Sequence, residues 1–432
     1  MAAGNRFSDV VIVGGGASGL AAAVELRMSS PELGVTVIEK LGEPGRKLRA
    51  TGSGRCNITN TGADGYIEIL KFFSRIGLVT RTYENGLVYP YSESAADMAD
   101  LLTSRARELG VDLITDAEVS DVSAAGRNNS ADAGENSGTG RFRTSYMKKG
   151  KPHVLCSDYV ILACGGKAGP SFGTTGDGYR FARELGHTIV TPVPVLTSIE
   201  CGEWSETHRP CAVSLAGTRT RGVVTLYKYP AENAGKGIQI FEEGGEIQFT
   251  RYGLSGICVF NMTRHMRYDR SRGESLANFT VKADLYPDGD IEAFLRERRA
   301  NSFPGELTED VLRTVLKENI AAYVLDSACA AQIRADSKPV SELTDEDISS
   351  IGDAVHGLDF HPERLRGWKD AQATSGGVSL EDIFTDTCES RLVEGLYITG
   401  ELADRDYPCG GFNLSNAWIT GLAAARSICL KK

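Results

Sequence analysis

The sequence predicts an α/β fold, because a short apolar run, a glycine-rich turn, a helical stretch and a second apolar run follow one another near its start. The two apolar runs, Val10–Val13 and Val35–Ile38, are rich in β-branched residues, as parallel strands buried on both faces are. Strand patterns of period two interrupt this arrangement later, and a last apolar strand and helix complete it near the C-terminus. We therefore expect a Rossmann-like domain that contains a β-rich insert.

The glycine turn carries a dinucleotide-binding fingerprint. Gly14, Gly16 and Gly19 stand at the G-x-G-x-x-G spacing, which permits a tight turn, close approach of a pyrophosphate and packing of helix on strand. The helix predicted from Ala17 to about Met28 would direct its first N–H groups at that pyrophosphate. Glu39 lies 39 − 19 = 20 residues past the last glycine, where an acid binds a ribose diol and repels a 2′-phosphate. The expected ligand is the ADP part of FAD or NAD rather than NADP.

Composition limits the class of protein. The chain has 432 residues and a formal net charge of −10, which leaves little to attract a phosphate backbone, so we expect no nucleic-acid partner. Its ten cysteines lack any CxxC or metal-ligand spacing and suit buried thiols in a reducing cytoplasm. No apolar run reaches the roughly 20 residues of a membrane span, and we interpret the N-terminal glycine triplet as part of the fold rather than of a targeting segment. We expect a cytoplasmic protein that binds a small-molecule substrate and no metal.

A basic, glycine-rich segment, Leu41–Asn60, follows the second predicted strand and shows no apolar periodicity. A solvated surface loop is the alternative, but it would not need so many glycines, and we favour a cofactor-binding loop. Four cations would lie near the pyrophosphate: Arg46, Lys47, Arg49 and Arg55. Three small residues would let the backbone pass close to a flat ligand: Gly52, Ser53 and Gly54.

Six stretches resemble, in the same sequence order, the bacterial BaiN-like (YhiN-like) flavoprotein family. They are GGGASG, Glu39-Lys40, GRKLRATGSGRCNITN, Ala163–Tyr179, Phe249–Gly256 and Ile398–Gly421. Members are described as NAD(P)/FAD-dependent oxidoreductases or as aminoacetone oxidase family proteins. The resemblance covers nearly the whole chain. It implies FAD in the first unit, a domain of the two-dinucleotide-fold type, and a distant relationship to the fumarate reductase and succinate dehydrogenase flavoproteins.

The fingerprint and the resemblance together nominate a cofactor site drawn from both ends of the chain. Its expected residues in the N-terminal part are Gly14, Gly16, Ala17, Ser18, Gly19, Glu39, Lys40, Arg46, Lys47, Ser53, Gly54, Arg55, Cys56, Asn57 and Val119. Val119 is included because in similar folds the end of this strand touches the adenine through its backbone. Its expected residues in the later part are Gly165, Gly166, Gly400, Glu401, Gly411, Asn413 and Leu414.

Local patterns predict the elements between these stretches. The N-terminal half should contain helical structure over Ile58–Ser74 with a glycine interruption, a hairpin over Tyr83–Ser92 turning at Asn85-Gly86, and a helix over Ser94–Gly110. Strands should follow over Val111–Val119, Arg141–Lys148, His153–Ser157 and Asp158–Cys164, and then a helix over Tyr179–Leu185. We expect Ser123–Gly140, which has almost no apolar residue, to be a flexible loop. The TGDG turn before Tyr179 suits an anion-facing turn and a plain helix cap equally well.

From Ile189 the composition changes to proline breaks and short strands. We expect strands over Val195–Ile199, Val213–Leu215, Gly222–Tyr229, Ile238–Ile240 and Glu246–Phe249, and helices over Glu292–Leu325 and Asp345–Ile351. By the resemblance, the strands form a small β-barrel and the helices a cap. The predicted division is a first FAD-binding part over 1–190, an inserted β-barrel over 191–287, a helical cap over 288–364 and a last FAD-binding part over 365–432.

The chain ends with a predicted strand over Gly395–Thr399, a glycine-rich loop and a helix from about Ser415 to Leu430. A helix N-terminus directed at a flavin pyrimidine stabilises the negative charge that appears on N1–C2=O upon reduction. We assign that role to the backbone of Gly411–Leu414.

Flavin performs the redox step itself, so the protein must orient the substrate and supply or remove one proton. The candidates for that proton transfer are Arg251, Tyr252, Arg405, Tyr407 and His361, each of which could instead be a packing or ion-pairing residue. Cys56 lies in a cofactor loop but has no second cysteine at close spacing, so we interpret it as structural.

These observations predict an FAD-dependent oxidoreductase. Reduced nicotinamide, NAD(P)H, would pass hydride to FAD, and FAD would reduce a small organic acceptor. Because a family relative is associated with reduction of an unsaturated steroid ring, an enone is one conceivable acceptor. Two other hypotheses are an FAD-dependent RNA-modifying protein, which would require a basic face, and a flavin-holding scaffold with little turnover.

Overall fold

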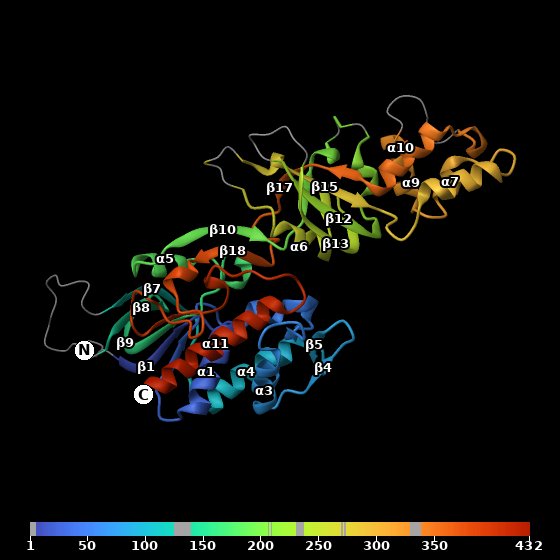
Figure 1. Cartoon of the computed structure of the whole chain (residues 1–432). Coiled ribbons are helices and arrows are strands. Elements are labelled where there is room, and N and C mark those ends of the chain that lie inside the picture. Colours follow the sequence, from blue (N-terminus) through green and yellow to red (C-terminus); the bar gives the residue numbers. More distant parts are fainter. Residues whose placement is uncertain are drawn as a thin grey trace. The chain divides into compact units, whose positions relative to one another are not determined.

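The computed structural model describes residues 6–124, 140–205, 207–208, 210–229, 237–268, 271, 274–328 and 338–432. The chain forms two compact units (Figure 1), of which unit 1 comprises Met1–Pro194 with Gln372–Lys432 and unit 2 comprises Val195–Ala371. The predicted α/β fold with an antiparallel insert is confirmed. The finer borders predicted within the insert stay predictions, and most of the predicted loop Ser123–Gly140 lies outside the described residues.

Unit 1 is built on a seven-stranded sheet with a parallel centre. The parallel strands lie in the order β6 (Asp112–Ile114), β2 (Val35–Ile38), β1 (Arg6–Val13), β9 (Lys151–Leu162) and β19 (Leu396–Ile398). Strands β8 (Phe142–Lys148) and β7 (Ala117–Ala124) extend the sheet antiparallel from the first half of β9. The strand predicted over Val35–Ile38 is confirmed residue for residue.

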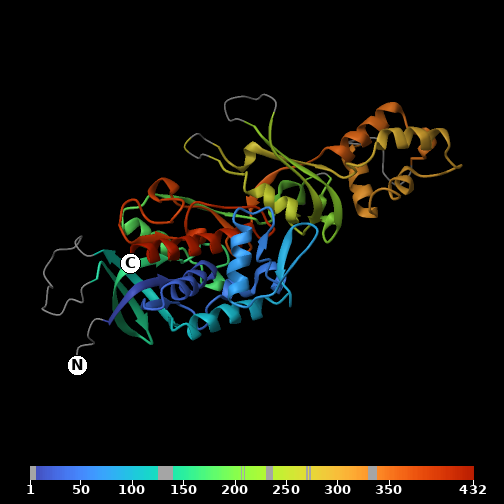
Figure 2. The same ribbon diagram turned by 60° about the horizontal axis from the view of Figure 1, so that its bottom comes forward.

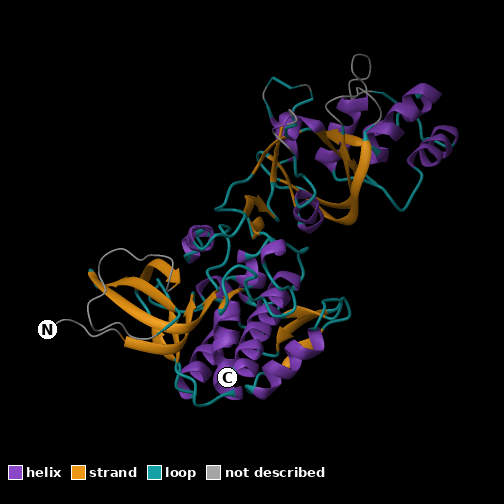
Figure 3. Cartoon of the chain, turned by 60° about the vertical axis from the view of Figure 1, so that its left-hand side comes forward, coloured by secondary structure: helices purple, strands orange, loops and turns teal. Residues whose placement is uncertain are grey.

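The stretch Val10–Val13 of β1 is apolar at every position because each face of the sheet is covered there. Val10 and Ile12 belong to the core shared with helices α1 (Ala17–Ser29), α4 (Ala95–Glu108) and α11 (Phe412–Lys431), whereas Val11 and Val13 face helix α5 (Asp177–Glu184) and strands β7 and β8. Alternate side chains of a strand point to opposite faces, so a doubly covered strand needs no polar position. Figure 3 shows the helices of unit 1 gathered beside these strands.

Helices α1 and α11, the first and last of the chain, pack side by side (Figure 2). Their closest approach is at Gly421, where an added Cβ would lie 2.4 Å from the backbone oxygen of Ser18. This approach fixes the last helix against the glycine turn at the start of the chain, because a side chain at Gly421 would separate the two backbones.

A small antiparallel sheet completes unit 1. It consists of β3 (Thr59–Asn60), β5 (Leu87–Pro90) and β4 (Thr80–Thr82) and lies beside helix α3 (Tyr66–Arg75). The predicted hairpin around Gly86 is confirmed. So is the following helix, since Ser94 caps α4 by accepting a hydrogen bond from the backbone N–H of Asp97.

Unit 2 contains a second seven-stranded sheet, in which neighbouring strands pair antiparallel in the described residues. Its strand order is β16 (Leu358–Phe360), β15 (Phe279–Asp284), β12 (Arg219–Lys228), β13 (Ile238–Phe249), β14 (Gly253–Ser255), β11 (Ile199–Cys201) and β17 (Pro362–Leu365). Its helices are α6 (Ile257–Thr263), α7 (Ile291–Ala300), α8 (Thr308–Leu312), α9 (Glu318–Ala328) and α10 (Asp345–His356). Closure of this sheet into a barrel stays a prediction. The chain leaves and re-enters unit 1 through the paired strands β10 (Ile189–Val195) and β18 (Ala373–Val378).

Some predicted elements are wrong in their bounds. The strand predicted over Val111–Val119 is two strands, β6 and β7, because the backbone turns at Asp116, whose φ is +51°. The helix predicted over Ile58–Ser74 begins only at Tyr66, after Gly65 in the left-handed region. Residues 153–164 belong largely to one long strand, β9, instead of two.

Three further predictions are wrong in detail. The strand predicted over Val213–Leu215 is a 3₁₀ turn, and the predicted loop Leu41–Asn60 contains the short helix α2 (Arg46–Arg49) and a 3₁₀ turn over Thr51–Gly54. The last helix, α11, starts at Phe412, three residues earlier than predicted. Among the described residues, no helix combines the length and the apolar character that crossing a membrane requires.

Candidate cofactor site

The glycine turn between β1 and α1 has the geometry that its spacing predicts. Gly14 has φ +108°, and a Cβ there would lie 2.5 Å from the backbone oxygen of Ala163. A Cβ at Gly19 would lie 2.0 Å from the backbone oxygen of Gly14, so this glycine permits the packing of helix on strand. At Gly16, by contrast, no described atom lies within 4 Å of an added Cβ. This open space stands at the N-terminus of α1, which no side chain caps, and it suits an anion such as a pyrophosphate.

Glu39, at the end of β2, lies against the same turn. Its Oε2 accepts a hydrogen bond from the backbone N–H of Gly15 at 2.8 Å, and its Oε1 accepts one from the N–H of Leu41 at 2.9 Å. An ionised carboxylate offers about four lone-pair sites, so both oxygens can accept further bonds. The acid therefore lies where the fingerprint requires it, and ribose binding by it stays a prediction.

Lys40 connects the end of β2 to the start of α5. Its Nζ lies 2.7 Å from Asp177 Oδ2 and 2.7 Å from Thr175 Oγ1. Although partial burial raises the pKa of Asp177, the hydrogen bonds from Lys40 and Thr175 leave that pKa below its usual value. The TGDG turn is thus tied to a predicted cofactor residue, and no side chain caps α5 at Gly176.

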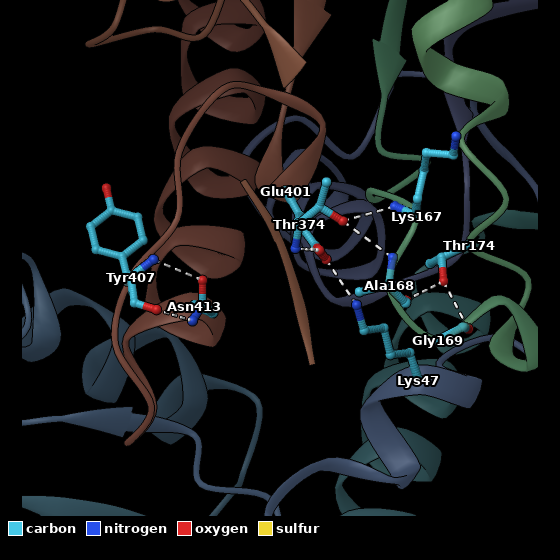
Figure 4. Close-up of polar contacts among 9 residues, drawn as sticks. All are labelled: Lys47, Lys167, Ala168, Gly169, Thr174, Thr374, Glu401, Tyr407 and Asn413. Atoms are coloured by element: carbon cyan, nitrogen blue, oxygen red, sulfur yellow. Dashed lines mark hydrogen bonds and ion pairs between the residues drawn. The ribbon is translucent and has the colours of Figure 1, made fainter. Parts of the chain in front are cut away.

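A polar network joins four distant segments (Figure 4). Lys47 Nζ, on α2, lies 2.9 Å from Glu401 Oε2, and Glu401 Oε1 accepts a hydrogen bond from the backbone N–H of Thr374 at 2.6 Å. The Thr374 hydroxyl in turn accepts hydrogen bonds from the backbone N–H groups of Lys167, at 2.9 Å, and Ala168, at 3.1 Å. A Cβ at Gly166 would lie 2.3 Å from that hydroxyl oxygen. No sequence motif indicated Thr374, and its only signal was its place in the predicted last FAD-binding part, 365–432.

The loop before α11 is shaped by Asn413. Its Oδ1 accepts a hydrogen bond from the backbone N–H of Tyr407 at 3.1 Å, and its Nδ2 donates to the Tyr407 backbone oxygen at 2.7 Å (Figure 4). Every residue from Asp404 to Leu414 is half-buried. Gly411 has φ +96°, and no side chain caps the helix that begins after it. The first N–H groups of this 20-residue helix can therefore stabilise negative charge.

Asn57 faces the start of α11 with an unsatisfied atom. It is buried, and its Oδ1 has no hydrogen-bond partner among the described residues. That oxygen lies 3.0 Å from the position that a Cβ at Gly411 would occupy. A buried acceptor without a donor costs about 1–3 kcal/mol, which a ligand N–H group would recover. Asn57 and the start of α11 thus fit the polar edge of a flat heterocycle.

The loop between α2 and β3 contains consecutive left-handed residues. Gly52 and Ser53 both have φ +56°, and Gly54 has φ +86° with no described atom within 4 Å of an added Cβ. Ser53 is a non-glycine residue in this region, a conformation that proteins retain mainly at functional sites. Arg46 and Arg55 flank the loop and are exposed.

The remaining predicted cofactor residues lie in the same unit. Ala17 and Ser18 begin α1, Gly165 follows β9 with φ +70°, and the N–H of Gly400 donates to the Thr420 hydroxyl at 2.8 Å. The premise for Val119 was wrong, because Val119 lies inside β7, opposite Tyr146, rather than at the end of a strand. The predicted contact of Val119 with adenine therefore no longer follows from its position in the strand, and it stays a prediction.

Cys56 is buried, and its Sγ lies 3.0 Å from the sulfur of Met98. Burial raises the pKa of this thiol to about 12, so at about pH 8 only about one molecule in ten thousand carries the thiolate that reacts with electrophiles. These observations favour the structural interpretation of Cys56.

We expect iodoacetamide at about pH 8 to leave Cys56 unlabelled in the folded protein, because both burial and the raised pKa protect it. The partly exposed Cys211 serves as the internal control and should be alkylated. Peptide mass spectrometry before and after unfolding measures both sites. Labelling of Cys56 at the rate of Cys211 would contradict the structural interpretation.

The candidate proton-transfer residues divide between the two units. Arg405 and Tyr407 lie in the loop before α11 in unit 1, and Arg251 and Tyr252 lie in the turn between β13 and β14 in unit 2. The guanidinium of Arg366 lies 4.5 Å from the centre of the Tyr252 ring. Catalysis by any of them stays a prediction.

His361, the fifth candidate, forms a pair within unit 2. Its Nδ1 lies 2.6 Å from Oε1 of Glu203, a buried carboxylate that also accepts hydrogen bonds from the His361 backbone N–H. Sequence analysis missed Glu203 and Arg366, because their partners are distant along the chain and no local pattern indicates them.

Comparison with known proteins gives consistent similarities. The family model described as HI0933-like protein Rossmann domain matches residues 8–68 and 65–427. The chain is 31% identical over 444 residues to the 3-dehydro-bile acid delta(4,6)-reductase of Clostridium scindens, covering 98% of this chain and 99% of that protein. It is 24% identical over 442 residues to the ribosomal RNA dihydrouridine synthase of Haemophilus influenzae, covering 98% and 99%.

Among solved structures, the 3-ketosteroid delta1-dehydrogenase of Sterolibacterium denitrificans has a similar fold. Its TM-score to this chain is 0.51 at 14% identity, and the match covers 99% of this chain and 100% of the other. At this level of identity the likeness concerns the fold alone.

Proposed function

The chain belongs to the HI0933-like Rossmann-domain family and is an FAD-dependent oxidoreductase. We propose that it uses NAD(P)H to reduce a small organic acceptor. In this proposal the acceptor contains a carbon–carbon double bond conjugated with a carbonyl group. One observation carries the proposal, namely that unit 1 contains two helix N-termini that no side chain caps. The N-terminus of α1 lies at Gly16, which has open space around it, and the N-terminus of α11 lies beside the Oδ1 of Asn57, which accepts no hydrogen bond from the described residues. These features fit the two ends of one flavin nucleotide.

The residues present fit FAD at its pyrophosphate, its adenosine ribose and its heterocycle. The space at Gly16 suits the pyrophosphate, and Glu39 suits the hydroxyls of the adenosine ribose. Asn57 offers an acceptor to an N–H of the heterocycle, and the first N–H groups of α11 offer donors to its carbonyl edge. The left-handed residues from Gly52 to Gly54 keep the adjoining backbone free of side-chain obstruction.

When bound, FAD supplies the redox chemistry, accepting and delivering a hydride. The protein's own part is electrostatic and steric. The helix dipole of α11 stabilises negative charge at its N-terminus, and the bonds from Asn413 to the backbone of Tyr407 hold the neighbouring loop in place. We assign the proton that completes acceptor reduction to Tyr407 or Arg405 on this loop, or to Arg251 or Tyr252 of unit 2.

The acceptor class follows from the chemistry that the relatives' names share. A 3-dehydro delta(4,6) compound contains a ketone and ring double bonds, and dihydrouridine is uridine with two added hydrogens. Both names describe reduction of a double bond conjugated with a carbonyl. In such a group the carbonyl oxygen takes up negative charge when hydride adds to the far carbon, so one hydride and one proton complete the reaction. The net charge of −10 disfavours a nucleic-acid substrate, and we therefore propose a small molecule.

Anaerobic mixing of the holoprotein with NADH or NADPH is expected to bleach the visible absorption band of oxidised flavin. Addition of a conjugated 3-ketosteroid should then restore the band, whereas the saturated 3-ketosteroid should not. Stopped-flow spectroscopy measures the two steps separately. Failure of both nicotinamides to bleach the flavin would refute the proposed reductant. Equal reoxidation by the saturated ketone would refute the proposed acceptor.

A further inference from the structure

Aromatic and cationic side chains gather on one face of the hairpin formed by β4 and β5 in unit 1. The two strands are labelled in Figure 1. Arg81 and Tyr89 are direct cross-strand partners, and their side chains therefore share a face. Tyr83 follows the end of β4 and Tyr91 follows the end of β5. Tyr83 contacts the Tyr89 ring and Tyr91 contacts the Arg81 guanidinium, so both belong to the same cluster. Tyr83 is 36% exposed and Tyr91 is 59% exposed, whereas Tyr89 is buried at 6% and supports the cluster from within. We call these four residues with Arg55 the tyrosine face.

Contacts within the tyrosine face hold its rings and cations together. The Arg81 guanidinium lies 4.2 Å from the centre of the Tyr91 ring, and the Arg55 guanidinium lies 5.1 Å from that of Tyr89. The rings of Tyr83 and Tyr89 meet edge to face at 5.6 Å. Edge-to-face and cation–π contacts are favourable at these distances and fix the orientation of each ring. The face therefore presents preformed aromatic surfaces beside cations.

The charge of the tyrosine face is not balanced. Glu93 lies 3.9 Å from a guanidinium nitrogen of Arg55 and 3.9 Å from one of Arg81. One carboxylate thus serves two arginines, and pairs this long and exposed contribute little. An anion with more acceptor oxygens, such as a phosphate, would pair with both arginines more strongly.

The hairpin is joined directly to the start of α11. β3 pairs with β5, and Asn60 of β3 donates through Nδ2 to the backbone oxygen of Gly410 at 3.2 Å. The neighbouring Thr59 hydroxyl lies 2.7 Å from that of Ser415 in α11. On the other side, Tyr89 lies 3.6 Å from the Cβ position of Gly52. The tyrosine face therefore borders both loops that we assign to the flavin end of the cofactor site.

We propose that the tyrosine face binds the adenosine phosphate part of NAD(P)H, with the adenine stacked on Tyr91 and the phosphates paired with Arg81 and Arg55. This proposal rests on the proposed function, which requires the nicotinamide to come to the flavin. Exposed aromatic rings stack on any nucleobase, and arginine matches phosphate geometry. RNA offers the same chemistry, but the net charge of −10 favours the small dinucleotide.

The test uses AMP as the probe and the FAD-loaded, full-length protein. Isothermal titration calorimetry should detect AMP binding to the wild type. Tyr91→Ala should weaken it about 5- to 150-fold, the range found when a stacking ring is removed. Tyr91→Phe keeps the ring and should bind as the wild type does. Arg81→Ala should also weaken binding, whereas Arg219→Ala, which removes an exposed arginine of unit 2, should not. Flavin content checks that each variant is folded.

Three results would overturn the proposal. The first is absence of AMP binding to the wild type, and the second is equal binding by wild type, Tyr91→Ala and Arg81→Ala. The third is an oligoribonucleotide that displaces AMP and binds at least about 100-fold more tightly, because it would reassign the face to RNA. Failure of the proposed function is distinguishable, since AMP would still bind at Tyr91 while NADH and NADPH left the flavin oxidised.

Discussion

Replacing Gly16 with valine is expected to weaken FAD binding severely and to leave the fold intact. The Cβ of a side chain at this position meets no described atom within 4 Å, so the free protein accommodates it. Valine would instead occupy the space that we assign to the pyrophosphate. Losing two charge-assisted hydrogen bonds at about 1.5–3 kcal/mol each would weaken FAD binding about 150-fold or more. Flavin fluorescence titration of the apoprotein measures the dissociation constant, and thermal unfolding measures stability.

Two matched substitutions make this result interpretable. Gly19→Ala places a Cβ 2.0 Å from the backbone oxygen of Gly14 and should destabilise the fold as well as remove flavin. Gly367→Val adds the same side chain as the test variant at a glycine of unit 2 that also has open space around it, and it should change neither property. Normal FAD affinity in the Gly16→Val protein would show that the pyrophosphate lies elsewhere.

Gly411→Ala is expected to destabilise unit 1 and to weaken flavin binding together. Gly411 has φ +96°, which costs a side-chain-bearing residue about 1–2 kcal/mol. Its added Cβ would also lie 2.7 Å from the backbone carbon of Thr59 and 3.0 Å from Asn57 Oδ1, so β3 must move away from the start of α11. We expect a total loss of about 2–5 kcal/mol in the free energy of unfolding. Urea denaturation followed by tryptophan fluorescence measures it.

The adjacent Gly410→Ala separates the two causes. Gly410 has φ +110°, but its added Cβ would meet only side-chain atoms, at 3.6 Å or more. In this variant only the cost of a positive φ should lower the free energy of unfolding, and most of the flavin affinity should remain. Equal effects of the two substitutions would mean that the close approach of Gly411 to Thr59 is unimportant for the site.

The predictable parts of this fold are those in which a local pattern has only one structural solution. The glycine turn, the strand Val35–Ile38 and the Ser94-capped helix are of this kind, because spacing, β-branching and capping chemistry act over a few residues. The strand predicted over Val111–Val119 failed because its break depends on the backbone of Asp116. The short run Val213–Leu215 is apolar for packing reasons, and at that length its pattern does not distinguish a strand from a 3₁₀ turn.

The candidate site likewise contains residues that a sequence motif indicates and residues whose partners lie far away along the chain. The fingerprint indicates Gly16 and Glu39 by spacing alone. In contrast, the partner of Lys47 is Glu401, 354 positions away, and Thr374 completes that network from a third segment. Nothing in the sequence next to Lys47 indicates either partner, since the pairing exists only after the sheet has assembled. For the same reason the sequence predicted the hairpin turn but not the contacts that form the tyrosine face.

The insertion of unit 2 between Pro194 and Gln372 determines the order in which the protein can mature during translation. The ribosome releases the glycine turn early, but β19, α11 and Thr374 are synthesised only after the whole of unit 2. Unit 2 is a continuous segment and can fold on emergence, whereas the flavin end of the site must wait for the final 61 residues, 432 − 371. Until β19 is synthesised, the parallel sheet is incomplete, because Val160–Leu162 of β9 lack the second of the strands with which they pair. FAD loading is expected only after α11 has been synthesised and has packed on α1.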